Sequence, residues 1–398
     1  MTIFDKCYDF QRVHKAIEAG YYPYFIPLDE NDGTVASYNG HRLIMIGSNN
    51  YLGLTTDPRV RAAASEAIDR YGSSCTGSRF LNGTLALHED LERELADFVN
   101  KEAALVFSNG YQVNLGVISA LLGRRDIVIL DHDNHASIID GCRLSVADSR
   151  RFHHNDMDHL DHVLRSCPSK AGKLVIVEGV YSMSGDIAPL PQIVELCQKY
   201  NCQLMVDDAH GIGVIGGGRG SAAHFGVSGQ VDLIMGTFSK SLASLGGFIA
   251  GDRQVIHYIK HFARTMIFSA STTPSNTAAA LAALRIARDE PERIERLTAI
   301  GQRMKREFID LGLEVDNTET PIVPVILGDE METLGMWRAL FDAGIFTNPV
   351  IPPAVSPNAS RLRTSYMATH TDEQLDLVIE TIRQVISKLG GQAASGFV

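Results

Sequence analysis

Two residues in the middle of the chain stand where strongly apolar segments end. Asp207 is the last residue of the run at 203–207, and Lys240 follows the run at 233–237. A lysine at the end of a central strand is expected to have a lowered pKa, which leaves a neutral amine able to form a Schiff base. Alone, Lys240 could lie on the surface and Asp207 could cap a helix. As a pair they offer what pyridoxal 5'-phosphate (PLP) requires, an amine for its aldehyde carbon and a carboxylate for its ring nitrogen.

Other groups of such a site follow other expected strands. Gly110 and Tyr111 come after the run at 103–107 and open a helical pattern, so their backbone amides can hold a phosphate. His135 follows the run at 127–131 and offers a ring that stacks on a cofactor. Each signal is weak alone, since Ser-Asn-Gly is common in turns. Together they predict a PLP site.

Short apolar segments are expected to position these residues as strands, at 103–107, 127–131, 174–178, 203–207, 233–237 and 247–250. Several are continuous apolar runs, which is typical of strands buried on both faces. Helical patterns lie between some of them, at 87–99, 113–122 and 190–200. This alternation predicts an α/β fold with a mostly parallel central sheet flanked by helices.

The chain is expected to divide into an N-terminal arm, a large PLP-binding domain and a smaller C-terminal α+β domain, at 1–45, 46–284 and 285–398. The last domain is predicted from apolar residues at helical spacing between Ile294 and Leu311. Further elements are expected after it, a strand at 322–327 and helices at 332–343 and 372–389.

Composition narrows the class of protein. The chain has 398 residues, 45% hydrophobic and 21% charged, which fits a globular protein of about two domains. Its net charge of −11 disfavours nucleic acid as a partner. No apolar run is long enough to cross a bilayer, so integral membrane association is not expected, while transient membrane contact stays open. The six scattered cysteines are expected to be reduced, which predicts a cytoplasmic protein.

These motifs, in this order, resemble the α-oxoamine synthases. That family consists of PLP-dependent enzymes of fold type I that join an amino acid to an acyl-CoA with loss of carbon dioxide. Similar segments occur along nearly the whole chain, at 47–54, 72–83, 178–186, 236–247 and 362–370. The combination is specific, although no single segment is.

The resemblance implies a role for each residue of the PLP site. Lys240 would carry the cofactor as a Schiff base and move protons at the substrate α-carbon, Asp207 would pair with the ring nitrogen, and His135 would stack on the ring. The ring oxygen would be bound by Ser182 and His210. The phosphate would be bound by Gly110, Tyr111, Thr237 and, from a neighbouring subunit, Ser269. This last role implies a homodimer with shared active sites.

The resemblance also implies residues that bind substrate. Arg363 would hold the amino-acid carboxylate through its planar guanidinium, although alone it could be a surface arginine. Asn50 would bind the same carboxylate, and His135 would touch it as well. The Pro-rich segment 352–357 would belong to a loop that closes on substrate.

Within the family, the segments 236–247, 348–357 and 367–371 are most similar to those of bacterial soluble serine palmitoyltransferases. This implies the condensation of L-serine with palmitoyl-CoA to 3-ketodihydrosphingosine, CoA and carbon dioxide, the first step of sphingolipid synthesis. The chemistry of glycine C-acetyltransferase or 8-amino-7-oxononanoate synthase, with another amino acid and acyl donor, stays open as an alternative.

Two other interpretations fit less well. The four histidines between 153 and 162 are of a type that binds metal, but they are expected to lead into a helix instead. A nicotinamide-dependent oxidoreductase would need Gly-x-Gly-x-x-Gly where its first strand meets its first helix, and none stands there. The glycine-rich segment 216–220 lacks the Lys-Ser/Thr ending of a phosphate loop and is expected to be a turn.

Overall fold

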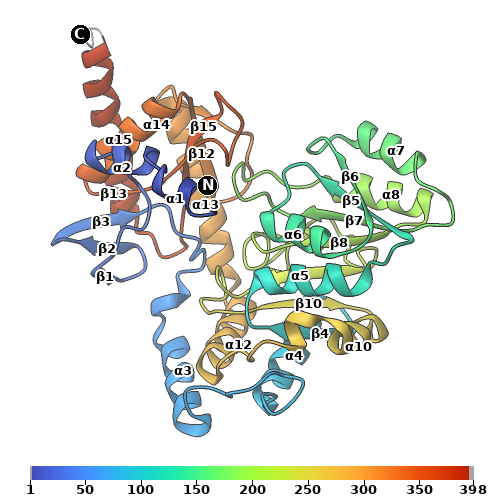
Figure 1. Cartoon of the computed structure of the whole chain (residues 1–398). Coiled ribbons are helices and arrows are strands. Elements are labelled where there is room, and N and C mark those ends of the chain that lie inside the picture. Colours follow the sequence, from blue (N-terminus) through green and yellow to red (C-terminus); the bar gives the residue numbers. More distant parts are fainter. Residues whose placement is uncertain (1, 394–398) are drawn as a thin grey trace.

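The structure, a computed structural model, describes residues 2–393. In this part of the chain the central feature is a seven-stranded sheet (Figure 1). Its strands, in spatial order, are β4 (Ala103–Phe107), β10 (Gly247–Gly251), β9 (Leu233–Thr237), β8 (Gln203–Asp207), β7 (Gly172–Glu178), β5 (Asp126–Asp131) and β6 (Asp148–Phe152). Strands β6, β5, β7, β8 and β9 run parallel, and β10 is antiparallel to β4 and β9. The predicted mostly parallel sheet is confirmed.

Helices cover both faces of this sheet. One face carries α5 (Gly110–Leu121), α6 (Ala136–Leu144) and α10 (Arg253–Phe262). The other carries α4 (Ala86–Phe98), α7 (Met157–Arg165), α8 (Leu190–Tyr200) and α12 (Pro274–Asp289), with α3 (Pro58–Tyr71) packed on α12. Short helices in the connections are η1 (Leu54–Thr56), α9 (Ser221–His224) and α11 (Arg264–Ile267).

The continuous apolar strands divide their side chains between two cores. In β5, Ile127 and Ile129 pack into one core, while Val128 and Leu130 pack into the other. Successive side chains of a strand point to opposite faces, so a strand covered on both sides must be apolar at every position. Strand β6 is not predicted from the sequence, because it is a polar edge strand that pairs only with β5.

The C-terminal part has a core of its own. The long helix α13 (Pro291–Asp310) buries Ile300, Met304 and Phe308 against Trp337. A second sheet consists of β11 (Glu314–Val315), β12 (Ile322–Gly328), β15 (Ser360–Ser365) and β14 (Asn348–Val350), accompanied by the helices α14 (Glu330–Asp342) and α15 (Asp372–Ala393). The predicted strand and helices of this region are all present.

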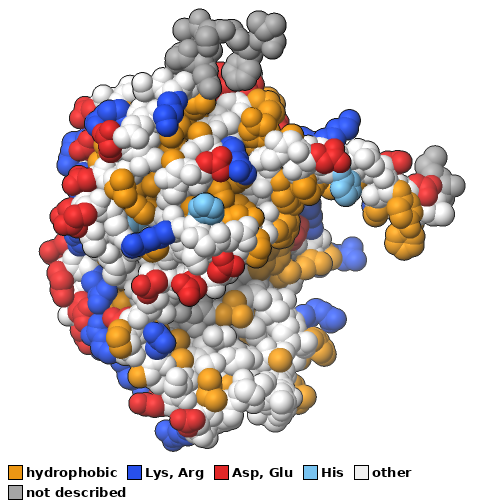
Figure 2. Space-filling model, turned by 90° about the vertical axis from the view of Figure 1, so that its left-hand side faces the viewer, with side chains coloured by type: hydrophobic (Ala, Val, Ile, Leu, Met, Phe, Trp, Pro, Cys, Tyr) orange, Lys and Arg blue, Asp and Glu red, His pale blue; other side chains and the backbone are white. Residues whose placement is uncertain are grey.

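The predicted N-terminal arm has two different parts. Helices α1 (Asp5–Tyr8) and α2 (Arg12–Glu18) bury no side chain, and Figure 2 shows this segment projecting from the body of the protein. Strands β1 (Glu30–Asn31), β2 (Val35–Tyr38) and β3 (His41–Met45) instead form a sheet with β13 (Ile345–Phe346). Residues 30–45 therefore pack with the C-terminal part, and position 285 lies inside α12. The domain limits at 46 and 285 stay predictions.

Across residues 2–393, none of the helices combines the length and the apolar character needed to cross a bilayer.

Candidate active site

Loops that follow β4, β5, β7, β8 and β9 line one cavity of about 270 Å³. The lining residues are Asn109, Gly110, Tyr111, Asn114, His135, Ser137, Glu178, Asp207, Ala209, His210, Met235, Thr237, Ser239 and Lys240. Most of the residues that the sequence predicts for a PLP site are among them. The cavity lies at the carboxyl ends of the parallel strands, which is where ligands bind in open α/β sheets.

Asp207 and Lys240 are brought together by strand pairing. Strands β8 and β9 are parallel neighbours. Asp207 ends β8, and Lys240 stands three residues beyond the end of β9. Both side chains therefore lie at the same edge of the sheet.

The surroundings of Lys240 favour its neutral amine. Burial lowers the pKa of Lys240 to about 8, against the opposing effect of the Asp207 and Glu178 carboxylates, and the positive charge of Arg363 adds to the lowering. A neutral amine is the form that attacks an aldehyde. Lys240 is thus suited to hold a cofactor carbonyl near neutral pH.

Asp207 is a buried carboxylate that accepts hydrogen bonds from neutral donors. Its oxygens accept hydrogen bonds from Asn114 Nδ2 at 2.7 Å and from the backbone N–H of Ala209 at 3.2 Å. Within residues 2–393 no arginine, lysine or histidine nitrogen stands within 4 Å of this carboxylate. A buried anion calls for a cation, and the protonated ring nitrogen of PLP fits that requirement. Asn114 is a site residue that the sequence analysis missed.

Glu178 orients the loop that carries His135. Its carboxylate accepts a hydrogen bond of 2.6 Å from the backbone N–H of His135. Burial, with a further contribution from Asp207, raises the pKa of Glu178 well above its ordinary value. The His135 side chain caps α6 by accepting from the N–H of Ser137 at 3.2 Å. His135 is an exposed residue, yet the surrounding protein atoms desolvate its ring and lower its pKa, so the neutral ring is favoured.

The start of α5 lines the cavity and is suited to bind an anion such as phosphate. Asn109 caps the helix by accepting from the N–H of Gln112 at 2.9 Å, which leaves the first amides free. A Cβ at Gly110 would lie 3.0 Å from Thr237 Oγ1 and 3.2 Å from the methyl of Met235. A side chain at position 110 would therefore crowd Thr237 and Met235, which would have to shift by a few tenths of an ångström. Free amides at a helix start bind anions.

Arg363, on β15, is buried beside the cavity. Its guanidinium donates to the backbone oxygen of Ser182 at 2.5 Å, to Asn49 Oδ1 at 2.9 Å and to the hydroxyls of Tyr51 and Ser365 at 3.3 Å. All of these partners are neutral, and no carboxylate among residues 2–393 lies within 4 Å of Arg363. The cation is therefore left without a counter-charge.

Besides Arg363, three predicted site residues lie outside this cavity. Asn50 donates to Thr55 Oγ1 at 2.8 Å, and it is the neighbouring Asn49 that contacts Arg363. The Ser182 side chain lines an adjacent cavity of about 440 Å³. Ser269 accepts from Gln112 Nε2 of its own chain at 3.3 Å, close to the start of α5. The binding roles of these residues stay predictions.

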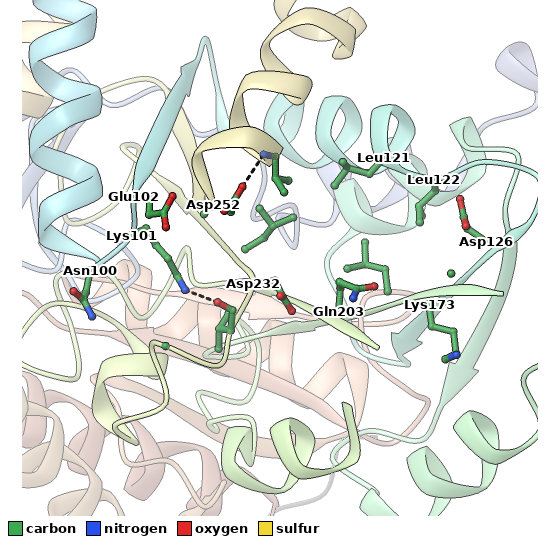
Figure 3. A pocket seen from close by; sticks show the side chains of 17 residues that line it. Asn100, Lys101, Glu102, Leu121, Leu122, Asp126, Lys173, Gln203, Asp232 and Asp252 are labelled. Atoms are coloured by element: carbon green, nitrogen blue, oxygen red, sulfur yellow. Dashed lines mark hydrogen bonds between the residues drawn. The ribbon is translucent and has the colours of Figure 1, made fainter. Parts of the chain in front are cut away.

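A larger cavity, of about 710 Å³, lies at the opposite edge of the same sheet (Figure 3). It is lined by Asp126, Gln203 and Leu233, which stand at the amino ends of their strands. It is lined by two lysines. Lys101 donates to the backbone oxygens of Ser228 and Val231, and Lys173 donates to the backbone oxygen of Ala171. Nothing in this cavity matches the chemistry of the predicted site.

The histidine-rich segment is engaged in hydrogen bonds and packing. His154 lies between two carboxylates, 3.0 Å from Asp131 and 2.9 Å from Asp186. Burial disfavours its charged form, but these hydrogen bonds outweigh burial and raise the pKa of His154 to about 10. In the described chain, no three histidine, cysteine or acidic side chains are grouped as a metal site would need.

The residues of the cavity at Asp207 and Lys240 fit three functional groups of PLP, its aldehyde, its ring nitrogen and its phosphate. Lys240 supplies an amine with a pKa of about 8, and Asp207 supplies a carboxylate with no basic side chain of residues 2–393 within 4 Å. The start of α5 at Gly110 lines the same cavity. Residues 41–382 match the family described as aminotransferase class I and II. The chain belongs to this family.

Curated members of the family are similar to this protein over nearly its whole length. A serine palmitoyltransferase of Bacteroides ovatus is 50% identical over 376 residues, which cover 94% of this chain and 95% of the relative. That of Sphingobacterium spiritivorum is 48% identical over 380 residues, which cover 95% of each chain. An 8-amino-7-oxononanoate synthase of Bacillus pumilus is 43% identical over 363 residues, which cover 91% and 93%.

Solved structures agree with this assignment. The serine palmitoyltransferase of Sphingomonas wittichii matches with a TM-score of 0.95 and 39% identity, covering 98% of this chain and 99% of that one. A serine palmitoyltransferase (SPT) with a PLP internal aldimine matches with a TM-score of 0.94 and 38% identity, covering 97% and 98%. The predicted fold type I transferase and its dependence on PLP are confirmed.

Proposed function

We propose that this protein is a serine palmitoyltransferase, which condenses L-serine with palmitoyl-CoA to 3-ketodihydrosphingosine, CoA and carbon dioxide. The observation that carries the proposal is the buried guanidinium of Arg363, which has only neutral partners and lies near enough to Lys240 to lower its pKa. A buried cation without a counter-charge is costly. The carboxylate of an amino-acid substrate supplies that charge, and the four curated serine palmitoyltransferases at 45–50% identity support serine.

The cavity residues would hold PLP at all of its polar groups. Lys240 would bind its aldehyde carbon and Asp207 its ring nitrogen. The amides of Gly110 and Tyr111, with Thr237, would bind its phosphate, and Ser269 of a partner subunit would complete that site. His135 would cover the ring face, and His210 and Ser182 would bind the ring oxygen. When bound, PLP supplies an electron sink for negative charge at the amino-acid α-carbon.

Lys240 and Arg363 would then have different roles toward the substrate, proton transfer and carboxylate binding. The Lys240 amine, with a pKa of about 8, takes the proton from the α-carbon of serine. Arg363 and Asn50 hold the serine carboxylate while the α-carbon bonds to the thioester carbon and CoA leaves with the electrons of the C–S bond. Arg363 releases the carboxylate as it departs as carbon dioxide. Lys240, now an ammonium group, returns its proton to the same carbon.

We also propose a homodimer with shared active sites, acting in the cytoplasm. Large apolar side chains are exposed near the start of α5, with Phe268 at 74% and Leu81 at 77%. Their loops lie side by side, because the N–H of Ser271 donates to the backbone oxygen of Gly77 at 2.9 Å. Exposed apolar groups of this kind favour an interface, and the free cysteines fit a reducing compartment. Light scattering is expected to give the dimer mass, and a fully active monomer would refute shared sites.

The substrate assignment is tested by the release of CoA from palmitoyl-CoA with serine, glycine, alanine or threonine, with the ketone product identified by mass spectrometry. Serine is expected to be the preferred amino acid. A second candidate is 8-amino-7-oxononanoate synthase, favoured by the 43% identity to the Bacillus pumilus protein. Preference for alanine together with another acyl donor would replace the first proposal by this one.

A further inference from the structure

Tyr51 connects two parts of the candidate active site. Its ring is fully buried, and its hydroxyl lies 2.7 Å from Nδ1 of His210, 3.3 Å from Nη2 of Arg363 and 3.3 Å from Oδ1 of Asn49. Tyr51 is itself anchored, since its backbone oxygen accepts from the N–H of Ala368 at 2.8 Å. The hydroxyl thus stands between the guanidinium that binds substrate and the histidine that faces the cofactor.

The position of the hydroxyl proton follows from counting donors and acceptors. A guanidinium only donates, so the Tyr51 oxygen accepts from Arg363. The single Tyr51 proton can then go to His210 Nδ1 at 2.7 Å or to Asn49 Oδ1 at 3.3 Å. Asn49 Oδ1 already accepts from Arg363 at 2.9 Å, and 2.7 Å is the usual length of a strong hydroxyl hydrogen bond. The much shorter distance favours donation from Tyr51 to His210 over donation to Asn49.

This donation determines which nitrogen of His210 carries the proton. Burial, and then the positive charges of Lys240 and Arg363 and the His135 ring, hold the pKa of His210 well below its ordinary value, so its ring is neutral. A neutral imidazole has one donor nitrogen and one acceptor nitrogen. Because Nδ1 accepts from Tyr51, Nε2 must carry the hydrogen.

We propose that Tyr51 is a positioning residue that fixes His210 as its Nε2–H tautomer, ready to donate to the ring oxygen of PLP, and ties this donor to Arg363. The inference rests on the proposed PLP chemistry of the cavity. The other tautomer would present a lone pair to a negatively charged oxygen and repel it. Tyr51 thereby connects His210, which faces the cofactor, and Arg363, which binds the substrate, through one chain of hydrogen bonds.

The first test is a pH titration of the visible absorbance of the holoenzyme. A donor on the ring oxygen stabilises its negative charge and so favours the unprotonated Schiff base. In Tyr51→Phe this donor is no longer fixed, and the pKa of the absorbance change is expected to rise by about one unit or more. The matched control, Asn49→Ala, keeps the Tyr51–His210 bond and should titrate like the wild type. An unchanged pKa in Tyr51→Phe overturns the proposal.

The second test needs neither cofactor nor a folded variant at Tyr51. In the wild-type protein without PLP, labelled with ¹⁵N-histidine, the His210 signals are assigned by their loss in His210→Gln. Chemical shifts of a protonated Nε2 and an unprotonated Nδ1 are expected, and the reverse pattern overturns the proposal. Neither test measures turnover. A protein that passes both and makes no ketone from serine would therefore refute the proposed function and leave the role of Tyr51 intact.

Discussion

The side-chain amide of Asn114 donates a hydrogen bond of 2.7 Å to the carboxylate of Asp207. Asn114 lies one turn inside α5, the helix whose first amides are proposed to bind the phosphate, and Asp207 ends β8. The same helix therefore sets the positions of two proposed PLP-binding groups, the Asp207 carboxylate for the ring nitrogen and the first amides of α5 for the phosphate. The distance between these two ends of the site is fixed by secondary structure and not by loops.

Asn114→Ala is expected to weaken PLP binding by about tenfold, because a buried acceptor that loses its donor costs about 1–3 kcal/mol. Cofactor binding is measured by the quenching of protein fluorescence. Asn134→Ala is the matched control, since Asn134 is another buried asparagine of this sheet edge, and its amide donates to the backbone oxygen of Ile176. Equal loss of PLP affinity in both variants would contradict the role given to Asn114.

The rate of covalent PLP attachment to the cofactor-free protein should rise with pH and level off above about 8, the pKa of Lys240. The sign follows from the chemistry, because only the unprotonated amine attacks the aldehyde. The rate is read from the growth of the visible band after mixing. A rate that still climbs steeply between pH 9 and pH 10 would mean that the pKa of Lys240 is close to that of a free lysine, ~10.4.

Removal of the Lys240 charge should stabilise the cofactor-free protein. The pKa of Lys240 falls from 10.5 to about 8 on folding. Its charge therefore lowers the unfolding free energy by the full amount below pH 8, and this destabilisation disappears as the pH rises to 10.5. Lys240→Met is therefore expected to raise the unfolding free energy at pH 7, by up to about 3 kcal/mol. The gain should shrink toward pH 10 in urea titrations. Lys170→Met, at an exposed position, is the control. A gain independent of pH would contradict this explanation.

Arg363→Lys is expected to raise the KM for serine by about 100-fold, since loss of a buried bidentate ion pair costs about 2–5 kcal/mol. PLP affinity should change little, because Arg363 does not line the PLP cavity. Steady-state kinetics and a PLP titration separate the two effects. A variant that loses PLP affinity and keeps its KM would show that Arg363 serves the cofactor instead.

Gly110→Ala is expected to weaken PLP binding, because the added Cβ would stand 3.0 Å from Thr237 Oγ1 and displace that side chain from its position at the proposed phosphate site. The control is Gly335→Ala in α14, where a Cβ would meet nothing within 4 Å. That change should stabilise the helix by up to about 1 kcal/mol and leave PLP affinity unchanged. Normal PLP affinity in Gly110→Ala would place the phosphate elsewhere.

Residues next to buried strands could be found from the sequence, whereas their long-range partners could not. Asp207 and Lys240 stand beside continuous apolar runs, which mark strands covered on both faces. Asn114 and Tyr51 carry no comparable signal, since they act on residues 93 and 159 positions away in the chain. Motif similarity also cannot tell which of two adjacent side chains in the turn at 49–50 faces Arg363.

Some elements that are not predicted nevertheless carry local signals in the sequence. Helix α12 is not predicted, although Thr273 caps it by accepting from the N–H of Asn276 and Pro274 occupies its first position. Strands β1 to β3 are short, and β3 obtains a partner from β13, which lies about 300 residues later. That pairing depends on tertiary structure, so no local pattern in residues 30–45 reveals it.

The central claim is tested most directly with L-serine labelled with ¹³C in its carboxyl group, together with palmitoyl-CoA and the PLP-loaded protein. Labelled carbon dioxide and free CoA are measured in the same reaction. Decarboxylative condensation predicts one labelled carbon dioxide for each CoA released, with neither formed when serine is omitted. CoA release without labelled carbon dioxide would mean hydrolysis or simple acyl transfer and would contradict the proposed reaction.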